Sequence, residues 1–288
     1  MQVDLAFQYL KKKIIARAAN CAGYKDEFLK RRLEGRMRLK GLATYAEYAH
    51  FLDKNPIEFN NLLDALTINV SEFFRDATVW NTLRQQILPS MFREKLTTGS
   101  REFKVWSAGC ADGEETYTIT LLILDTLAYL SHSFRIEIMG TDVDLPSLDR
   151  ARRGQYAASR LRLVSQPILQ RYFIPADKGN FEVVDAVKKF VTFKPHDLFT
   201  LPPASGLDII SCRNVVIYFS KKLQEQLYQN FHNALNVGGY LILGKVESLV
   251  GEAASMFNCV DLSERIYRKA FEPTIQAANS NCQDPIGS

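Results

Sequence analysis

The chain has 288 residues, of which 47% are hydrophobic and 24% are charged, as in an ordinary folded globular protein. Its 18 phenylalanines and 12 tyrosines exclude a wholly disordered chain, and we expect no membrane insertion because no apolar run reaches about 18 residues. The five cysteines form no CxxC pair and there is no HExxH motif, so we expect no disulfide framework, no metal site and a cytoplasmic location.

Positive charge is concentrated at the start of the sequence. Residues 1–50 hold 11 Lys and Arg against 5 Asp and Glu, whereas the rest of the chain is close to neutral. A basic front end suits an acidic partner, which could be nucleic acid, a membrane surface or an acidic protein. The alternative is a basic helix face that is only solvated.

The first part of the chain has the pattern of helices. Apolar residues recur at helical spacing through residues 3–14 and again through 25–40, where arginines cover the remaining faces. Gly41 is placed to end the second of these helices, and a further helix covers roughly residues 79–95. We therefore predict a helical N-terminal domain over residues 1–78.

In the next part of the chain, short apolar runs alternate with amphipathic helices. The apolar runs cover residues 103–109, 135–142, 190–197, 207–212 and 238–244. Buried strands that alternate with helices form crossover units and therefore a mostly parallel sheet. The segment 256–270 is expected to add an antiparallel edge, which gives an α/β domain over residues 79–270.

Residues 155–190 interrupt this alternation. They contain two β-prone runs on either side of DKGN (177–180), a pattern typical of a β-hairpin. We predict a small antiparallel β-subdomain inserted into the α/β domain. The last stretch, residues 271–288, is polar without periodicity, so we expect a disordered tail.

The first candidate site is a glycine-containing turn after the strand 103–109. Gly109 and Gly113 are spaced GxxxG, which does not match the GxGxxG fingerprint of dinucleotide sites. Glu114 and Glu115 follow at the start of the next helix, where they would repel a pyrophosphate and attract a ligand ammonium group. The alternative is that both glutamates only complement the helix dipole.

Asp142 stands at the end of the next predicted strand. An acid at this place in an open α/β sheet can accept hydrogen bonds from both hydroxyls of a ribose. The alternative is a cap on the following helix, but Asp144 can take that role, with Pro146 in the first helical turn. A ribose and an ammonium group without a pyrophosphate describe S-adenosylmethionine.

Two further segments carry charged or polar side chains toward the same edge of the sheet. Arg213, Asn214 and Tyr218 follow the buried run 207–212 and are expected to face the ligand crevice. The alternative is a local salt bridge for Arg213 and a core position for Tyr218.

The run NVSEFFRD (69–76) lies between the helical part and the core. Phe73 and Phe74 are expected to pack in the interior. The planar guanidinium of Arg75 suits a carboxylate, and the alternative is a surface ion pair with Asp76 or Glu72.

Taken in order, five segments resemble the CheR family of chemotaxis-receptor glutamate O-methyltransferases. They are LLDALTINVSEFFRD (62–76), KVWSAGCADGEETY (104–117), GTDVD (140–144), DIISCRNVVIYF (208–219) and GGYLILGKVESL (238–249). The resemblance extends over about residues 5–270. It implies a class I S-adenosylmethionine-dependent methyltransferase fold, Rossmann-like, with an all-α N-terminal domain and a small inserted antiparallel β-subdomain.

The resemblance also implies site residues. Cofactor contacts carried over by motif fall on Asn69, Ser71, Arg75, Glu115, Asp142, Asp197, Leu198, Arg213 and Asn214. Arg75 and Tyr218 correspond to the residues that act near the transferred methyl group, and no metal is implied. The run Gly244–Ser248 reads GKVES where the family usually has GHSES, and Asp197 stands where Asn is common.

The function implied is transfer of a methyl group from S-adenosylmethionine to glutamate side chains of chemotaxis receptors, giving methyl esters and S-adenosylhomocysteine. A glutamate carboxylate is already ionised at neutral pH, because its pKa is about 4.3, and therefore needs no general base. The receptor helices would contact the basic helix 25–40 and the β-subdomain, and no nucleic acid is expected. The alternatives are a methyltransferase of RNA or another substrate, and a non-catalytic regulator that binds S-adenosylmethionine.

Overall fold

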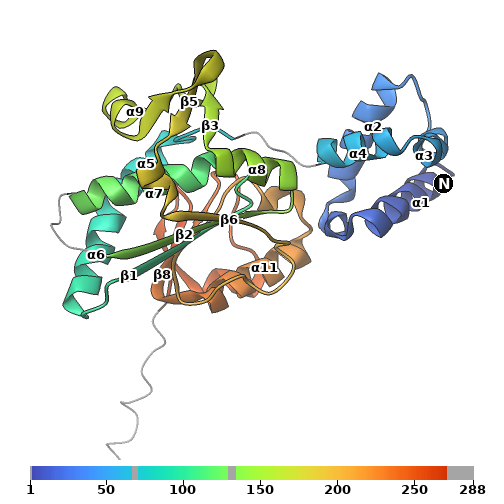
Figure 1. Cartoon of the computed structure of the whole chain (residues 1–288). Helices are drawn as coiled ribbons and strands as arrows, with labels where there is room; N and C mark the ends of the chain where they lie inside the picture. The colour runs from blue at the N-terminus through green and yellow to red at the C-terminus, as the bar shows by residue number, and fades with distance from the viewer. Residues whose placement is uncertain (1, 67–70, 129–133, 271–288) are drawn as a thin grey trace, which may run out of the picture.

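The computed structural model describes residues 2–66, 71–128 and 134–270. Within these ranges the N-terminal part is all-α, as predicted, and its helices stand to one side of a larger α/β part (Figure 1). The helices are α1 (Gln2–Arg17), α2 (Asp26–Leu39), α3 (Tyr45–Lys54) and α4 (Pro56–Leu66), and the 3₁₀ turn η1 (Ala19–Gly23) lies between the first two.

Local sequence explains where these helices begin and end. After α2 ends at Leu39, Gly41 takes a φ of +68°, the left-handed conformation that glycine adopts readily. α3 begins with a capping box, in which the side chains of Thr44 and Glu47 each accept a hydrogen bond from the other residue's backbone N–H. Apolar side chains from all four helices, such as the fully buried Phe7, form a separate core.

The helix predicted over 79–95 is present but is not uniform. It consists of α5 (Ala77–Thr82), a π-helical turn η2 (Leu83–Ile87) and α6 (Leu88–Thr97). Pro89 has no N–H to donate to the carbonyl of Gln85, so the regular α-helical ladder cannot continue through this turn.

Phe73 and Phe74 are buried, as predicted, in the core of the α/β part. The boundary at residue 78 between the helical domain and the domain 79–270 stays a proposal. Phe73 and Phe74, which pack in the α/β core, lie a few residues before this boundary.

The described strands of the α/β part form a seven-stranded sheet in the order β6-β2-β1-β7-β8-β10-β9. The first five strands in this order are parallel, and β10 is antiparallel to both of its neighbours. The strands are β1 (Glu102–Ala108), β2 (Arg135–Asp142), β6 (Val191–Pro195), β7 (Leu207–Cys212), β8 (Leu235–Leu243), β9 (Phe257–Asp261) and β10 (Ile266–Lys269). The predicted parallel sheet and its antiparallel edge are thus confirmed.

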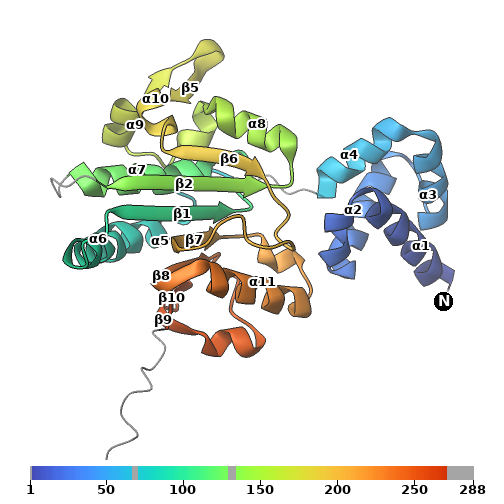
Figure 2. The ribbon, with the colours of Figure 1, turned by 60° about the horizontal axis from the view of Figure 1, so that its bottom comes forward.

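Helices lie on both faces of this sheet (Figure 2). α7 (Glu114–Ala128) and α8 (Leu145–Arg153) lie with α5 and α6 on one face, and α11 (Lys221–Ala234) lies on the other. Successive side chains of a strand point to opposite faces, so Val105 joins the first core and Trp106 the second. Among the described residues, no helix combines the length and apolarity that crossing a bilayer requires.

The predicted insertion is a small antiparallel sheet with the strand order β3-β5-β4. It comprises β3 (Gln155–Ala157), α9 (Gln166–Tyr172), β4 (Phe173–Pro175), β5 (Asn180–Val183) and α10 (Asp185–Lys188). The chain turns between β4 and β5 at Asp177–Gly179, where Lys178 and Gly179 have positive φ. The predicted hairpin around DKGN is therefore confirmed.

The order of the strands reverses between β1 and β7, because the chain leaves β1 toward β2 and later returns to the other side of β1. In open α/β sheets, ligands bind outside the carboxyl ends of the strands at such a reversal. The loops that follow β1, β2, β6 and β7 meet there.

Candidate active site

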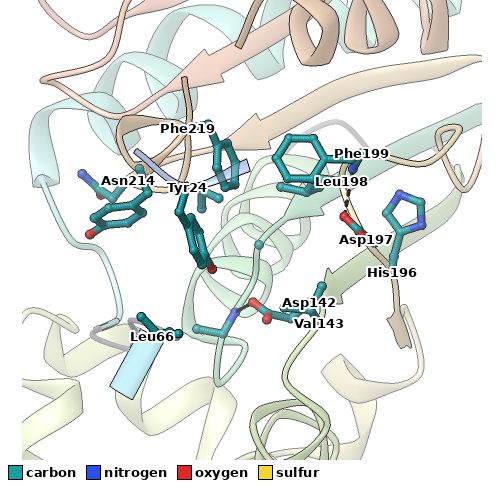
Figure 3. A pocket seen from close by; sticks show the side chains of 14 residues that line it. Tyr24, Leu66, Asp142, Val143, His196, Asp197, Leu198, Phe199, Asn214 and Phe219 are labelled. Atoms are coloured by element: carbon teal, nitrogen blue, oxygen red, sulfur yellow. Dashed lines mark hydrogen bonds between the residues drawn. The ribbon is translucent and has the colours of Figure 1, made fainter. Parts of the chain in front are cut away.

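Two adjoining cavities open at this edge of the sheet. The Asp142 cavity, of about 670 Å³, has Asp142, Val143, His196, Asp197 and Leu198 along one side and Tyr24 opposite (Figure 3). The Arg75 cavity, of about 1090 Å³, has Ser71, Arg75, Glu115, Arg213 and Lys245 around its wall. Both are also lined by Gly109, Ala111, Asn214, Val215 and Tyr218, so the two cavities adjoin at these residues.

The structure brings together every described residue of the predicted site. Asp142, Asp197 and Leu198 line the Asp142 cavity. Ser71, Arg75, Glu115 and Arg213 line the Arg75 cavity, and Asn214 and Tyr218 line both. Asn69 lies outside the described residues.

The turn after β1 needs glycine at its first position. Gly109 has a φ of +75°, and a Cβ placed on it would lie 2.6 Å from Cγ2 of Val215. The N–H groups of Gly109 and Cys110 donate to the carbonyl of Thr141, at 2.8 and 2.9 Å. The end of β1 is thereby joined to the end of β2, which brings Asp142 beside the turn.

Asp142 accepts backbone hydrogen bonds with both carboxylate oxygens. Oδ2 accepts from the N–H of Ala111 at 2.9 Å and Oδ1 from the N–H of Asp144 at 3.0 Å. Burial raises the pKa of Asp142. Because each oxygen has two lone pairs, both can still accept a hydrogen bond from a ligand hydroxyl.

The capping alternative for Asp142 is wrong, because Asp144 occupies the N-cap position of α8. The side chain of Asp144 makes no cap bond to the backbone but accepts from the hydroxyl of Ser147 at 2.7 Å. Asp142 is thus left facing the cavity.

Only one of the two glutamates at the start of α7 faces the cavities. Glu115 lines the Arg75 cavity and accepts from the Ser107 hydroxyl at 3.0 Å. Glu114 is fully buried and pairs with Arg160 at 3.1 Å. The expectation that two carboxylates would meet a ligand at this turn is therefore wrong for Glu114. Consecutive helical residues point about 100° apart, so both could not face one cavity.

Arg213 is buried in an ion-pair network, so the local salt bridge that was the alternative for this residue is present. Arg213 also lines the Arg75 cavity. Its guanidinium lies 2.7 Å from Asp76 and 3.4 Å from Glu115, and donates to the carbonyl of Arg75 at 3.2 Å. It also lies over the ring of Trp80, 4.7 Å from the centroid. The network joins the start of α5 to the ends of β7 and the α7 turn, and so builds one wall of the Arg75 cavity.

Arg75 itself lines this cavity. The ion-pair alternative named Glu72 and Asp76, but Glu72 pairs with Arg162 at 2.8 Å and Asp76 pairs with Arg213. Tyr218 is half-buried against two hydrophobic cores, as its core alternative expected in part, and it also lines both cavities. Burial raises the pKa of Tyr218, and the positive charges of Arg32 and Arg75 oppose this shift.

Sequence reasoning assigned no role to Glu247, which shapes the loop after β7. Its buried carboxylate accepts from the N–H groups of Gly244 (2.6 Å), Asn214 (2.9 Å), Val216 (2.8 Å) and Ile217 (3.2 Å). Asn214 is held at a φ of +61°. Such unusual backbone conformations cluster at functional sites, and Ala111 and Asp76 at the same cavities also have positive φ.

Sequence reasoning also missed residues of the Asp142 cavity. His196 and Phe199 lie on either side of the predicted pair Asp197 and Leu198, so they could have been found from their place in the sequence. Tyr24 lies in the N-terminal part, and no local pattern indicates its place in the cavity. Figure 3 shows Tyr24 facing Asp142 across the hollow, and both residues line it.

The residues present fit S-adenosylmethionine. Asp142 offers acceptors for two hydroxyls, Glu115 offers a carboxylate for an ammonium group, and Arg213 and Arg75 offer guanidinium groups for a carboxylate. The apolar and aromatic lining of the Asp142 cavity, such as Leu198, suits a purine ring. In the described part of the chain, no cluster of His, Cys, Asp or Glu could hold a metal ion.

Comparison with known proteins shows the family of the chain. Residues 69–266 match the SAM-binding domain of the CheR methyltransferases, and residues 6–67 match their all-alpha domain. The chain is 31% identical to the chemotaxis protein methyltransferase of Borreliella burgdorferi, over 81% of this chain and 83% of the relative.

Two other relatives are about equally similar. The chemotaxis protein methyltransferase of Listeria monocytogenes is 31% identical, over 80% of this chain and 84% of the relative. The chemotaxis protein methyltransferase 2 of Pseudomonas aeruginosa is 32% identical, over 78% and 80% respectively. The chain therefore belongs to the CheR methyltransferase family, and its cofactor is S-adenosylmethionine.

Proposed function

We propose that the protein transfers a methyl group from S-adenosylmethionine to glutamate side chains of chemotaxis receptors. The products are glutamate methyl esters and S-adenosylhomocysteine. One observation carries the proposal: the Arg75 cavity, lined by an arginine whose guanidinium suits a carboxylate, adjoins the Asp142 cavity and shares five lining residues with it. The three relatives described above are named chemotaxis protein methyltransferases, which supports a receptor as the acceptor.

We assign the predicted cofactor residues to two groups. Asp142, Asp197 and Leu198 would hold the ribose and adenine. The amino-acid end would be held mainly by Asn69, Ser71, Glu115, Arg213 and Asn214, of which Asn69 lies outside the described residues. Arg75 would contact this end of the cofactor and also the acceptor. In this assignment Tyr218 lies between the groups, since it lines both cavities.

The residues of the Arg75 cavity suit an acceptor that is already ionised. When bound, S-adenosylmethionine supplies an electrophilic methyl group on a positively charged sulfur. Arg75 orients the acceptor carboxylate through its planar guanidinium, and Tyr218 shapes the space beside it. Among the described residues, no histidine lines this cavity, and burial raises the pKa of Cys110 well above its usual value. A glutamate carboxylate is already ionised at neutral pH, so the proposed reaction requires no general base from these residues.

The proposed reaction predicts a methyl product that alkali releases. The protein is incubated with methyl-labelled S-adenosylmethionine and a receptor cytoplasmic fragment from the same cell. We expect label on the fragment that mild alkali releases as methanol, because a carboxyl methyl ester hydrolyses readily. A fragment whose glutamates are replaced by glutamine is the control and should stay unlabelled.

Three outcomes would contradict the proposal. Alkali-stable label on the fragment would indicate another acceptor group. Label in RNA would favour the RNA methyltransferase alternative. Binding of S-adenosylhomocysteine without transfer to any receptor fragment would favour a non-catalytic regulator.

We propose that the receptor helix lies along α2, with the inserted sheet β3-β5-β4 as a second contact. Arg31 and Arg38 are exposed on α2 and lie seven residues apart, and therefore on one face. Arg36 is unsuited to docking, because its guanidinium binds both carboxylate oxygens of the buried Glu58, at 2.9 and 2.6 Å. Burial acts to raise the pKa of Glu58, but bonds from Arg36, Lys40 and Tyr48 outweigh it and lower the pKa to about 2.

This placement makes a prediction about α2. The double variant Arg31→Glu, Arg38→Glu should raise KM for the receptor fragment about fivefold, because it repels an acidic partner without burying charge. Steady-state kinetics measures KM, and calorimetry should show an unchanged affinity for S-adenosylhomocysteine. Lys222→Glu, an exposed reversal on α11, is the matched control and should leave KM unchanged. If the α2 double variant and the Lys222→Glu control had equal KM values, α2 would be only a solvated basic face.

A further inference from the structure

The loop that carries Tyr218 is held between two distant parts of the chain. We define the Tyr218 loop as residues 214–220, in which the only regular structure is the three-residue turn η5 (Val216–Tyr218). On one side, Glu247 accepts hydrogen bonds from three of its N–H groups, as described above. On the other side, the loop meets the segment that leads into α2 of the N-terminal part.

Three hydrogen bonds join the Tyr218 loop to this segment. The backbone N–H of Lys25 donates to the carbonyl of Tyr218 at 2.9 Å, and its Nζ donates to the carbonyl of Ile217 at 2.8 Å. The N–H of Ser220 donates to the carbonyl of Gly23 at 3.2 Å. Tyr24 and Phe219, between these bonds, pair as an isolated antiparallel β-bridge.

Aromatic side chains reinforce the junction. The ring of Phe28, in the first turn of α2, lies 4.8 Å from the ring of Tyr218, centroid to centroid. The rings of Tyr24 and Phe219 stack at 5.8 Å with 12° between their planes. The N-terminal part therefore contacts both the backbone and the ring of Tyr218.

We propose that Lys25 is a positioning residue for Tyr218, which it holds through the two carbonyl groups at the end of η5. The proposal rests on the proposed function, in which Tyr218 lies beside the transferred methyl group. Since α2 begins at Asp26, the next residue, the same contact links the basic helix to the site of transfer. A receptor that moves α2 would therefore also move Tyr218.

Two variants separate the hydrogen bonds of Lys25. Lys25→Met removes only the bond from Nζ, and Lys25→Pro removes both. The backbone angles permit proline, because Lys25 has φ −60° and the preceding Tyr24 has φ −72° and ψ 142°. Its Cδ would take the place of the N–H and push the Tyr218 carbonyl away. The carbonyl of Lys25, which accepts from the N–H of Leu29 to begin α2, remains in both variants.

We expect kcat to fall about threefold in Lys25→Met and about tenfold in Lys25→Pro, because a small misplacement of an active-site group is costly. Each Lys25 substitution is also introduced into the Tyr218→Phe protein. If Lys25 acts through Tyr218, each Lys25 change should lower kcat by less than about twofold in the Tyr218→Phe protein. Lys222→Met, which removes an exposed charge from α11, is the control and should leave kcat unchanged.

Amide hydrogen exchange tests the same proposal without any receptor. In the wild-type protein the Ser220 amide is bonded to Gly23 and is expected to be protected. Faster exchange at Ser220 in Lys25→Met and faster still in Lys25→Pro is the expected result. Unchanged exchange in both variants, or equal effects on kcat with and without the Tyr218 hydroxyl, would overturn the proposal. A wild-type protein that methylates no receptor would instead contradict the proposed function, and the exchange experiment would still decide about Lys25.

Discussion

Replacing Arg75 with alanine is expected to lower kcat for receptor methylation about 100-fold, while the dissociation constant of S-adenosylhomocysteine changes only about threefold. Arg75 lines the cavity proposed for the acceptor, as Tyr218 does, so its loss removes the group that orients the carboxylate. The carbonyl of Arg75 accepts from Trp80 at 2.7 Å and from Arg213 at 3.2 Å, and both bonds survive in the alanine variant. The local fold should therefore persist.

The comparison of turnover with binding decides what Arg75 does. Steady-state kinetics with the receptor fragment gives kcat, and calorimetry gives the affinity for S-adenosylhomocysteine. Equal losses in both would show that Arg75 only holds the cofactor. Arg75→Lys keeps the charge but lacks the planar fork, so it should recover little of the turnover. Arg162→Ala, which removes the exposed partner of Glu72, is the matched control.

The second large effect is expected at Asp142. Asp142→Ala should weaken binding of S-adenosylhomocysteine about 100-fold or more, because hydrogen bonds to a charged group contribute about 1.5–3 kcal/mol each. The change also leaves the N–H groups of Ala111 and Asp144 without their carboxylate acceptor. Asp144→Ala, which removes a carboxylate that bonds Ser147 instead, is the control and should bind nearly as the wild type does. Wild-type affinity in Asp142→Ala would contradict the assignment of the ribose to this cavity.

The pH dependence of S-adenosylhomocysteine binding is a second test of the role of Asp142. Burial raises the pKa of Asp142 in the protein without ligand. Hydroxyl groups that donate to the carboxylate favour its charged form and would lower this pKa in the complex. The complex would therefore bind fewer protons, so affinity is greatest above the ligand-free pKa of Asp142 and declines as the pH falls through it. Calorimetry at several pH values should show this decline in the wild type and not in Asp142→Ala.

The candidate site was predictable to the extent that its residues follow strands. Asp142 stands at the end of β2 and Asn214 after β7, and parallel strands bring such positions to one edge of the sheet. Periodicity alone could not show that a π turn interrupts the helix 79–95 just before Pro89, since the five residues Leu83–Ile87 are too few to change the apolar pattern of the whole segment. The separate orientations of Glu114 and Glu115 could have been foreseen, because neighbouring residues of a helix never share a face.

Helices, strands, the inserted hairpin and the polar residues at strand ends depend on neighbours in the chain, and the amino-acid pattern was sufficient for them. The contacts of Glu247, Tyr24 and Lys25 had no such pattern. Lys25 and Ile217, for instance, lie 192 residues apart and meet because the helical part packs against the loop after β7. Tyr24 lines a cavity, and Glu247 and Lys25 bond the loop that carries Tyr218. Such contacts exist only once the separate parts of the chain have folded against one another.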